Sequence, residues 1–423
     1  MSHSRIAHVV LTMLLIPSLA LASGFQLNEV GARAMGMGGA FTAKANDLTA
    51  MYFNPAGLAY QRGFGAYVGG TMILPSTTFT SPGGVSTDMV KQTFLLPNAY
   101  FGYGMENGLA FGVGVFVPFG LGTEWPAAWS GRFLAMKSDL QVIMVNPTIA
   151  YAVSDQFMVG AGVSMAFSKV ELGYDVPTLS SLAPITPSVG SVKLDATKNA
   201  FSFDAGMIYK PVPEFSIGVS YRHSTSLDLE GDAVFSNMQA LSTFFPGGTG
   251  KANITLPNTI FAGVAWDVND ALTLSADYHW VGWSTYDSLN LDLPLGPVAP
   301  PALGGRPLQG PSRSEKAWKD VYLIRAGGEY RYKAWAFRLG FVYDANPQPN
   351  KHVEPLLPDA NRVEGTVGVG YKFAPHWCVD AAFQFISFSD RTVTGPSTGD
   401  LNTFPGTYKS SANLFGLSIG YSM

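Results

Sequence analysis

The residue patterns that support enzyme chemistry are incomplete in this sequence. The run Gly36–Gly39 follows no strand and lacks the spacing of a dinucleotide-binding loop. The segment Gly162–Ala166 lacks the second glycine of a nucleophile elbow. The six histidines show no metal-ligand spacing, and a single cysteine, Cys378, cannot form an internal disulfide. We therefore expect no enzyme activity, no catalytic residue, no metal and no cofactor.

Basic residues within apolar segments are the stronger chemical candidates. Arg222, Arg325 and Arg338 interrupt stretches of aromatic and aliphatic residues, and Lys319 lies at the edge of another. Such cations can hold a carboxylate through charge-assisted hydrogen bonds. They could instead form ion pairs with acidic residues in comparable segments, which are Asp277, Glu329, Asp344, Glu364 and Asp380. The secondary structure that contains these basic residues determines whether a ligand carboxylate or an acidic side chain can contact them.

Those elements alternate with a period of two. Phe415, Leu417 and Ile419 fall on one face of the last segment, and Gly416 and Ser418 fall on the other. The polar face is poor in lysine and glutamate and the apolar face is rich in aromatic residues, as in strands that face lipid. The same pattern recurs in segments 215–222, 272–280 and 335–344.

The amino-acid composition is typical of a protein whose surface contacts lipid. Only 13% of the 423 residues are charged, against roughly 25% in soluble proteins, and 13% are aromatic. The net charge of −4 shows no basic excess, so we expect no nucleic-acid partner.

The N-terminus has the features of a secretory signal. Arg5 and His8 precede the apolar run Val9–Ile16, and Ala20–Ala22 provides a small-residue cleavage site. We assign residues 1–22 to a signal peptide. No later stretch reaches 18 apolar residues, which leaves a periplasmic protein or a membrane barrel.

Strand count and loop lengths favour the barrel. Connections alternate between tight turns and long loops, which is the asymmetry of bacterial outer-membrane barrels. We therefore predict an all-β protein, a fourteen-stranded antiparallel transmembrane barrel in a Gram-negative outer membrane, in contact with its lipid and monomeric. The predicted strands are 62–74, 90–103, 107–119, 138–153, 156–175, 191–210, 214–231, 251–267, 270–287, 317–332, 334–345, 361–373, 376–390 and 408–423.

Residues 23–60 do not follow the strand pattern. They mix small residues, polar groups and short helix-like stretches. A fourteen-stranded barrel is wide enough to leave a lumen, which a segment of this length could fill. We predict that residues 23–60 form a hatch that plugs the barrel and that residues 61–423 form the barrel.

Several motifs together resemble the FadL-type outer-membrane transporters of long-chain fatty acids and aromatic hydrocarbons. The resemblance covers essentially the whole mature chain. The motifs are Gly24–Glu29, Gly36–Phe41, Asn54–Ala56, Pro118–Glu124, Trp129–Arg132, Trp318–Asp320, Phe337–Gly340 and Tyr343-Asp344 followed by Pro347 and Pro349.

This resemblance implies a mechanism. The ligand, a fatty acid or an aromatic hydrocarbon, would be captured among outer loops and passed to a pocket inside the barrel. It would leave sideways where the third strand kinks toward Asn54, Pro55 and Ala56. The kink would lie at Pro118, Phe119 and Gly120, which interrupt a regular strand. An ordinary strand end with a Pro-Gly turn is the alternative.

Ligand contacts are expected from the basic residues and from one apolar loop. Arg338 is the first candidate for a head-group partner, followed by Arg325, Arg222 and Lys319. The loop 232–250 contains Phe235, Phe244 and Phe245 and almost no charge, so it could bind an oily ligand or pack against the neighbouring loop 176–190.

Other functions remain open at this point. A water-filled porin for polar solutes would have an open lumen, and a structural or adhesive barrel would have no ligand. An outer-membrane lipase with a Ser-His pair on the outer wall is the enzymatic alternative.

Overall fold

The structure is a computed structural model that describes residues 24–177, 189–296, 312–394 and 404–423. The predicted signal peptide, residues 1–22, lies outside these ranges. No helix among the described residues is long and apolar enough to cross a membrane.

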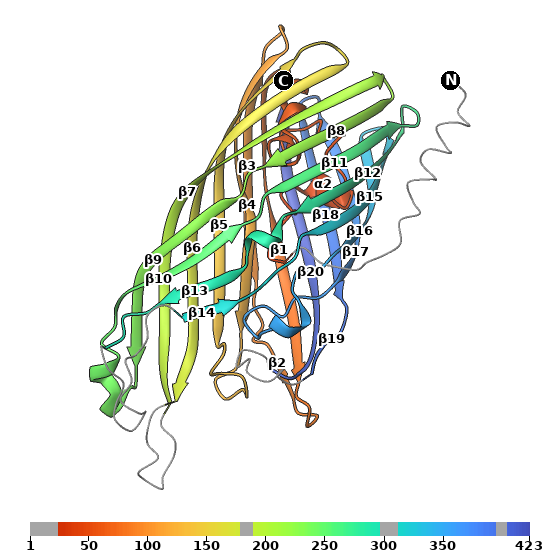
Figure 1. Cartoon of the computed structure of the whole chain (residues 1–423). Helices are drawn as coiled ribbons and strands as arrows, with labels where there is room; N and C mark the ends of the chain where they lie inside the picture. Colours follow the sequence, from red (N-terminus) through yellow and green to blue (C-terminus); the bar gives the residue numbers. More distant parts are fainter. Residues whose placement is uncertain (1–23, 178–188, 297–311, 395–403) are drawn as a thin grey trace.

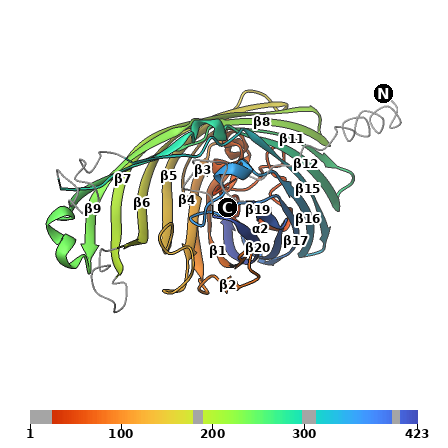
Figure 2. The same ribbon diagram turned by 60° about the horizontal axis from the view of Figure 1, so that its bottom comes forward.

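Fourteen antiparallel strands form a closed wall, as predicted (Figures 1 and 2). Each pairs with its neighbours along the chain, and β1 closes the ring against β20 from Gly65↔Ser422 to Thr80↔Thr407. Five wall strands consist of two consecutive pieces. In chain order the strands are β1 (Gly63–Thr80), β3 (Phe94–Gly104), β4 (Leu109–Glu124), β5 (Lys137–Ala152), β6 (Phe157–Pro177), β7 (Val189–Val212), β8 and β9 (Phe215–Arg222, Thr225–Ser236), β10 and β11 (Gly248–Leu256, Thr259–Asp267), β12 and β13 (Leu272–Val281, Ser288–Asp292), β14 and β15 (Ser312–Glu315, Val321–Tyr332), β16 (Trp335–Asp344), β17 (Arg362–Ala374), β18 and β19 (Trp377–Phe388, Arg391–Val393), and β20 (Gly406–Ser422).

Few other elements accompany the wall. The short strand β2 (Ser86–Asp88) folds back on β1. The helical segments are single turns or little more, namely α2 (Ala32–Gly36), α3 (Ala50–Phe53), η1 (Pro55–Tyr60), η2 (Gln239–Phe244), η3 (Trp283–Thr285) and η5 (Asn350–His352).

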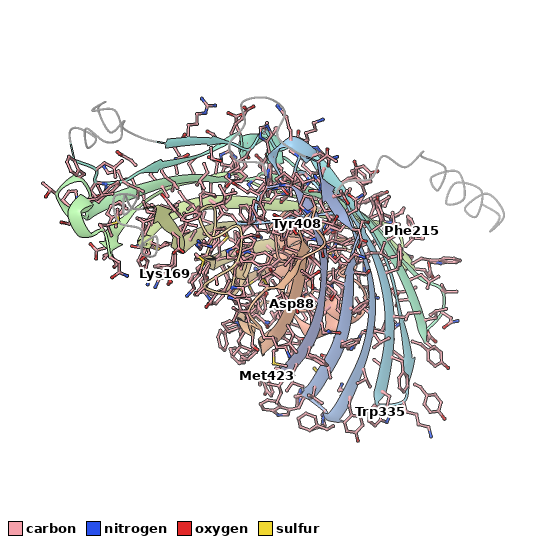
Figure 3. All side chains as sticks on the ribbon, turned by 90° about the horizontal axis from the view of Figure 1, so that it is seen from below. Asp88, Lys169, Phe215, Trp335, Tyr408 and Met423 are labelled. Atoms are coloured by element: carbon pink, nitrogen blue, oxygen red, sulfur yellow. The ribbon has the colours of Figure 1, made fainter. Side chains whose placement is uncertain are left out.

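The predicted alternation sets which side chains face outward. In β16, Phe337 and Leu339 are 50% and 67% exposed, whereas Arg338 between them is 7% exposed. In the view along the barrel, Trp335 lies on the outer side of the sheet and Tyr408 lies within the ring (Figure 3). The apolar outer face and the polar inner face are therefore arranged as in a membrane barrel.

Several strands are longer than their sequence patterns indicated, including the seventh, which continues to Ser236 rather than 231, and the ninth, which continues to Asp292 rather than 287. The first continues to Thr80 rather than 74, because it pairs with β2 and β20 beyond the alternating region. The third, β4, continues to Glu124 rather than 119, because it resumes pairing with β5 after Pro118.

The N-terminal segment, residues 24–60, lies inside the wall, where α2 is visible in Figures 1 and 2. Almost all of its side chains are buried. Gly36 is packed so closely on β17 that an added Cβ would lie 3.0 Å from the Gly368 Cα atom. Asp277 of β12 accepts hydrogen bonds from the Phe41 and Thr42 amides at 2.9 and 2.8 Å. The segment is thus bonded to the inner face of the wall.

Candidate functional site

The third wall strand, β4, contains a bulge at the predicted kink. Its pairing with β5 shifts between Phe116↔Met144 and Phe119↔Val142, which places one extra residue on β4. Pro118 lies in this bulge, where its missing N–H costs no ladder hydrogen bond. The bulge redirects the strand while the β4–β5 seam remains intact on both sides of it.

On its other edge, β4 separates from β3. The pairing of these strands ends at Ala99↔Val115, although β3 itself continues to Phe94 and remains paired there with β1. Farther along, the Val90 amide donates to the Glu124 carbonyl at 2.8 Å. Between these two points, β3 and β4 form no strand pairs, and we call this interval the wall gap.

In the wall gap, the N-terminal segment forms the backbone hydrogen bonds with β4 that β3 does not form. The Leu27 amide donates to the Pro118 carbonyl at 2.8 Å, and the Gly120 amide donates to the Phe25 carbonyl at 3.0 Å. Gln26 and Phe119 form an antiparallel bridge between these bonds. The free edge of β4 is therefore satisfied from inside the barrel, as buried backbone groups require.

A cavity of about 340 Å³ lies at the wall gap, and we call it the gap cavity. This volume lies within the usual range of small-molecule pockets. Both the buried Leu96 and Leu95, which is 67% exposed, line it. Neighbouring β3 residues point to opposite faces of the sheet, so the cavity extends from the interior to the outer side of the wall.

A second cavity of about 40 Å³, the inner cavity, lies beside it. Four apolar side chains line both cavities and so separate them. They are Phe25, Leu121, Leu140 and Leu357. Phe25 also packs on the Trp283 ring, with 4.6 Å between ring centroids, within a cluster that includes Tyr286 and Trp318.

Each cavity has one basic residue among its described lining residues, and each is paired with carboxylates. Arg362 in the gap cavity lies 2.8 Å from Asp359 and 3.6 Å from Asp344. Lys316 in the inner cavity is 2% exposed and forms an ion pair with Glu354. Both positive charges are therefore compensated within the protein.

The predicted arginines face the interior but do not line either cavity. Arg338 lies 2.8 Å from Glu329 and 2.7 Å from Asp380, in a network that continues through Arg33. These pairs join β15, β16 and β18 to α2.

The other predicted cations have different surroundings. Arg325 donates to the Gly38 carbonyl at 2.7 Å. Arg222 donates to the Tyr52 carbonyl at 3.2 Å and lies over the Tyr52 ring. Lys319 is exposed and lines neither of the described cavities.

The apolar loop lies at the far end of β9. Phe235 and Phe245 contact each other, with 5.2 Å between ring centroids, and the Gly296 amide donates to the Phe244 carbonyl at 2.8 Å. η2 is the green helix at the lower left of Figure 1. None of these phenylalanines lines the two described cavities. Phe235 belongs to β9, and the bond to Gly296 joins Phe244 to the segment after β13.

The segment Asn54–Ala56 packs away from the hydrogen bonds of the kink. The Asn54 side-chain amide donates to the Thr42 and Met207 carbonyls at 3.0 and 3.1 Å, and an added Cβ on Gly160 would overlap Pro55. These contacts tie the segment to β6 and β7. The residues bonded to the kink are Phe25 and Leu27, because an extended backbone is needed to satisfy the edge of β4.

Comparison with known proteins agrees with this architecture. The family described as outer membrane protein transport protein (OMPP1/FadL/TodX) matches residues 13–423. A 47 kDa outer membrane protein of Pasteurella multocida is 27% identical over 95% of this chain and 94% of its own length. A long-chain fatty acid transport protein of Salmonella typhi is 23% identical, with 96% of each chain covered.

Solved structures share the fold. A Pseudomonas aeruginosa FadL homologue superposes with a TM-score of 0.82 at 20% identity, covering 95% of this chain and all of its own. The toluene transporter TbuX of Ralstonia pickettii gives a TM-score of 0.69 at 22% identity, covering 93% and 98%. The family match spans nearly the whole chain, and the fold and the relatives place it in the outer membrane. This chain therefore belongs to the FadL/TodX family of outer-membrane transport proteins.

Proposed function

We propose that the protein carries hydrophobic compounds across the outer membrane and releases them sideways through the wall gap. The cargo would be a fatty acid, an aromatic hydrocarbon or a related apolar molecule. The names of the Salmonella and Ralstonia relatives support this class of cargo. Lateral release suits such a molecule, since each CH₂ that enters the bilayer gains about 0.8 kcal/mol.

One observation carries this proposal. The gap cavity coincides with the interval in which β4 leaves β3, and both buried and outward-facing β3 side chains line it. A strand that separates from its neighbour usually leaves costly unsatisfied backbone groups in a membrane. Here the N-terminal segment satisfies Pro118 and Gly120, so a permanent opening is compatible with a stable wall.

On its way from the outer loops to the gap cavity, the cargo would first occupy the inner cavity. The four apolar residues shared by the two cavities form the boundary between them. Side chains such as Leu121 and Leu357 can change rotamer, whereas the wall strands cannot move without breaking pairs. We infer that cargo captured among the outer loops passes this boundary to reach the gap cavity.

The N-terminal segment would act as the hatch. Its burial inside the wall and its bonds to Asp277 support a plug that excludes polar solutes. The Arg338 network would then brace hatch and wall, because its carboxylate partners already occupy the guanidinium.

Uptake by cells that lack their own transporter tests this function. Expression of the protein should increase entry of a labelled long-chain fatty acid or toluene, with no increase in entry of a sugar of similar mass. Equal increases for all solutes would indicate a porin. No increase for any solute would indicate a barrel without a transport role.

A further inference from the structure

The polar lining of the gap cavity points to a particular kind of cargo. Its described charged lining residues comprise five acidic side chains and one basic one. The basic residue, Arg362, is already paired with Asp359 and Asp344. An anion that enters this cavity therefore meets more acidic than basic side chains, in a buried site where electrostatic interactions are weakly screened.

Two of the acidic side chains share one side-chain amide group as their donor. The Gln384 side-chain amide donates to Glu364 at 2.6 Å and to Glu29 at 3.3 Å. Both carboxylates line the cavity, and Glu29 comes from the N-terminal segment whereas Glu364 comes from β17. This part of the lining is rich in acceptors and would favour a ligand that donates a hydrogen bond.

Unpartnered polar atoms in the same lining point to a ligand as well. Gln26 is 5% exposed, and its side-chain oxygen has no hydrogen-bond partner among the described residues. The Arg362 Nε–H group is likewise buried without a described partner, while another nitrogen of that guanidinium bonds the Gly24 carbonyl. A buried donor or acceptor without a hydrogen-bond partner destabilises the protein, unless a ligand or a water molecule supplies the bond.

A third residue with unpartnered polar atoms lies on the inner face of β3 at the edge of the wall gap, outside the lining of the gap cavity. Asn98 is the first β3 residue beyond the last β3–β4 pair, Ala99↔Val115. It is 3% exposed, and neither its side-chain oxygen nor its nitrogen has a partner among the described residues. The threshold of the wall gap thus also offers one donor and one acceptor.

We propose that the gap cavity takes uncharged hydrophobic molecules that carry a hydroxyl group, and that it disfavours carboxylate anions. A hydroxyl can donate to Gln26 or Glu364 and accept from Arg362, whereas a pure hydrocarbon makes neither bond and a carboxylate cannot donate. The apolar body would rest on Leu96 and Leu121. This inference rests on the proposed transport function and narrows its substrate class.

Binding of three matched probes to the purified full-length protein in lipid nanodiscs tests the inference. Para-butylphenol, butylbenzene and para-butylbenzoate share one apolar body and differ in the head group. Near neutral pH the phenol is uncharged and the benzoate is ionised. At equal free concentration, the phenol should bind about two- to tenfold more tightly than the hydrocarbon, as one net hydrogen bond provides. The benzoate should bind most weakly.

Two variants separate the polar contacts from simple packing. Gln26→Met keeps the length of the side chain and removes one of the two proposed acceptors, so the phenol should lose part of its advantage while hydrocarbon binding stays unchanged. Glu29→Gln combined with Glu364→Gln should raise benzoate affinity most. Gln92→Met is the matched control, since Gln92 does not line the cavity, and it should change none of the three affinities.

The outcomes distinguish this inference from the transport function. Benzoate that binds as tightly as the phenol, or equal losses of all three probes in Gln26→Met, would overturn the hydroxyl preference. Hydrocarbon binding and uptake could still persist in that case, which would leave the transport function standing. Absence of binding for every probe, together with absence of uptake, would overturn both.

Discussion

The carbonyl of Pro118 accepts a hydrogen bond from the Leu27 amide at 2.8 Å, in the interval where β4 is no longer paired with β3. One residue of this pair belongs to the wall and the other to the segment inside the barrel. The N-terminal segment is therefore bonded to the edge of β4 where β3 and β4 are unpaired, and in the proposed mechanism it keeps the exit open. Displacement of this segment should alter both the plug and the exit.

Arg338→Ala should destabilise the barrel. The substitution leaves Glu329 and Asp380 buried with one fewer positive partner. Breaking buried pairs of this kind costs about 3–5 kcal/mol. Urea titration in liposomes should register this loss of unfolding free energy, and uptake of carboxylated and neutral cargo should fall equally.

Arg331→Ala is the control, since Arg331 also contacts Glu329 but is 37% exposed, and it should cost less than about 1 kcal/mol. A selective loss of carboxylated cargo in Arg338→Ala would instead give Arg338 a head-group role.

Glu354→Gln should increase the affinity for a carboxylated ligand. Lys316 is buried in the inner cavity, and Glu354 compensates its charge. Burial lowers the pKa of Lys316 to about 7. Without that carboxylate and at a pH below this pKa, the ammonium group is available to an anionic head group, whose charge-assisted bond contributes about 1.5–3 kcal/mol. Glu315→Gln is the control at a nearby exposed carboxylate. Unchanged affinity for para-butylbenzoate in Glu354→Gln would mean that ligands do not reach Lys316.

Deletion of residues 24–50 should raise the conductance of single barrels in planar bilayers. These residues are buried inside the wall and include the Phe41 and Thr42 bonds to Asp277. Their removal leaves a lumen open to ions. Deletion of the exposed turn Pro82–Gly84 should leave conductance at the wild-type level. Equal conductance of both deletions would show that the segment is not the plug.

Much of the wall was predictable because strand alternation is a local property. The pattern around Arg338 predicts the strand, and acidic residues in comparable segments are its predicted alternative partners. Pro118 and Gly120 also marked the bulge, since both weaken a regular ladder.

The partners of these residues were not predictable from local patterns. Leu27 and Pro118 are far apart in the sequence, and no periodicity links an irregular segment to one strand edge. Lys316 was overlooked in favour of Lys319, because the residues between β14 and β15 do not alternate and their directions depend on the fold. Arg362 opens β17, and its place in a cavity depends on how Gly24 and Asp359 approach it.

The central claim is lateral exit, and a paired measurement of strand pairing and uptake tests it most directly. Pro118→Thr with Gly120→Val favours a continuous strand, and an added Cβ at Gly120 would lie 2.8 Å from a Leu27 methyl carbon. Pro147→Thr with Gly365→Val is the matched control, because Gly365 has open space around an added Cβ and neither residue lines the wall gap. The account predicts that the gap variant still folds but loses most of its uptake of butylbenzene, whereas the control variant retains that uptake. Normal uptake by a gap variant whose β3–β4 pairing is shown by hydrogen exchange to be continuous would contradict lateral exit.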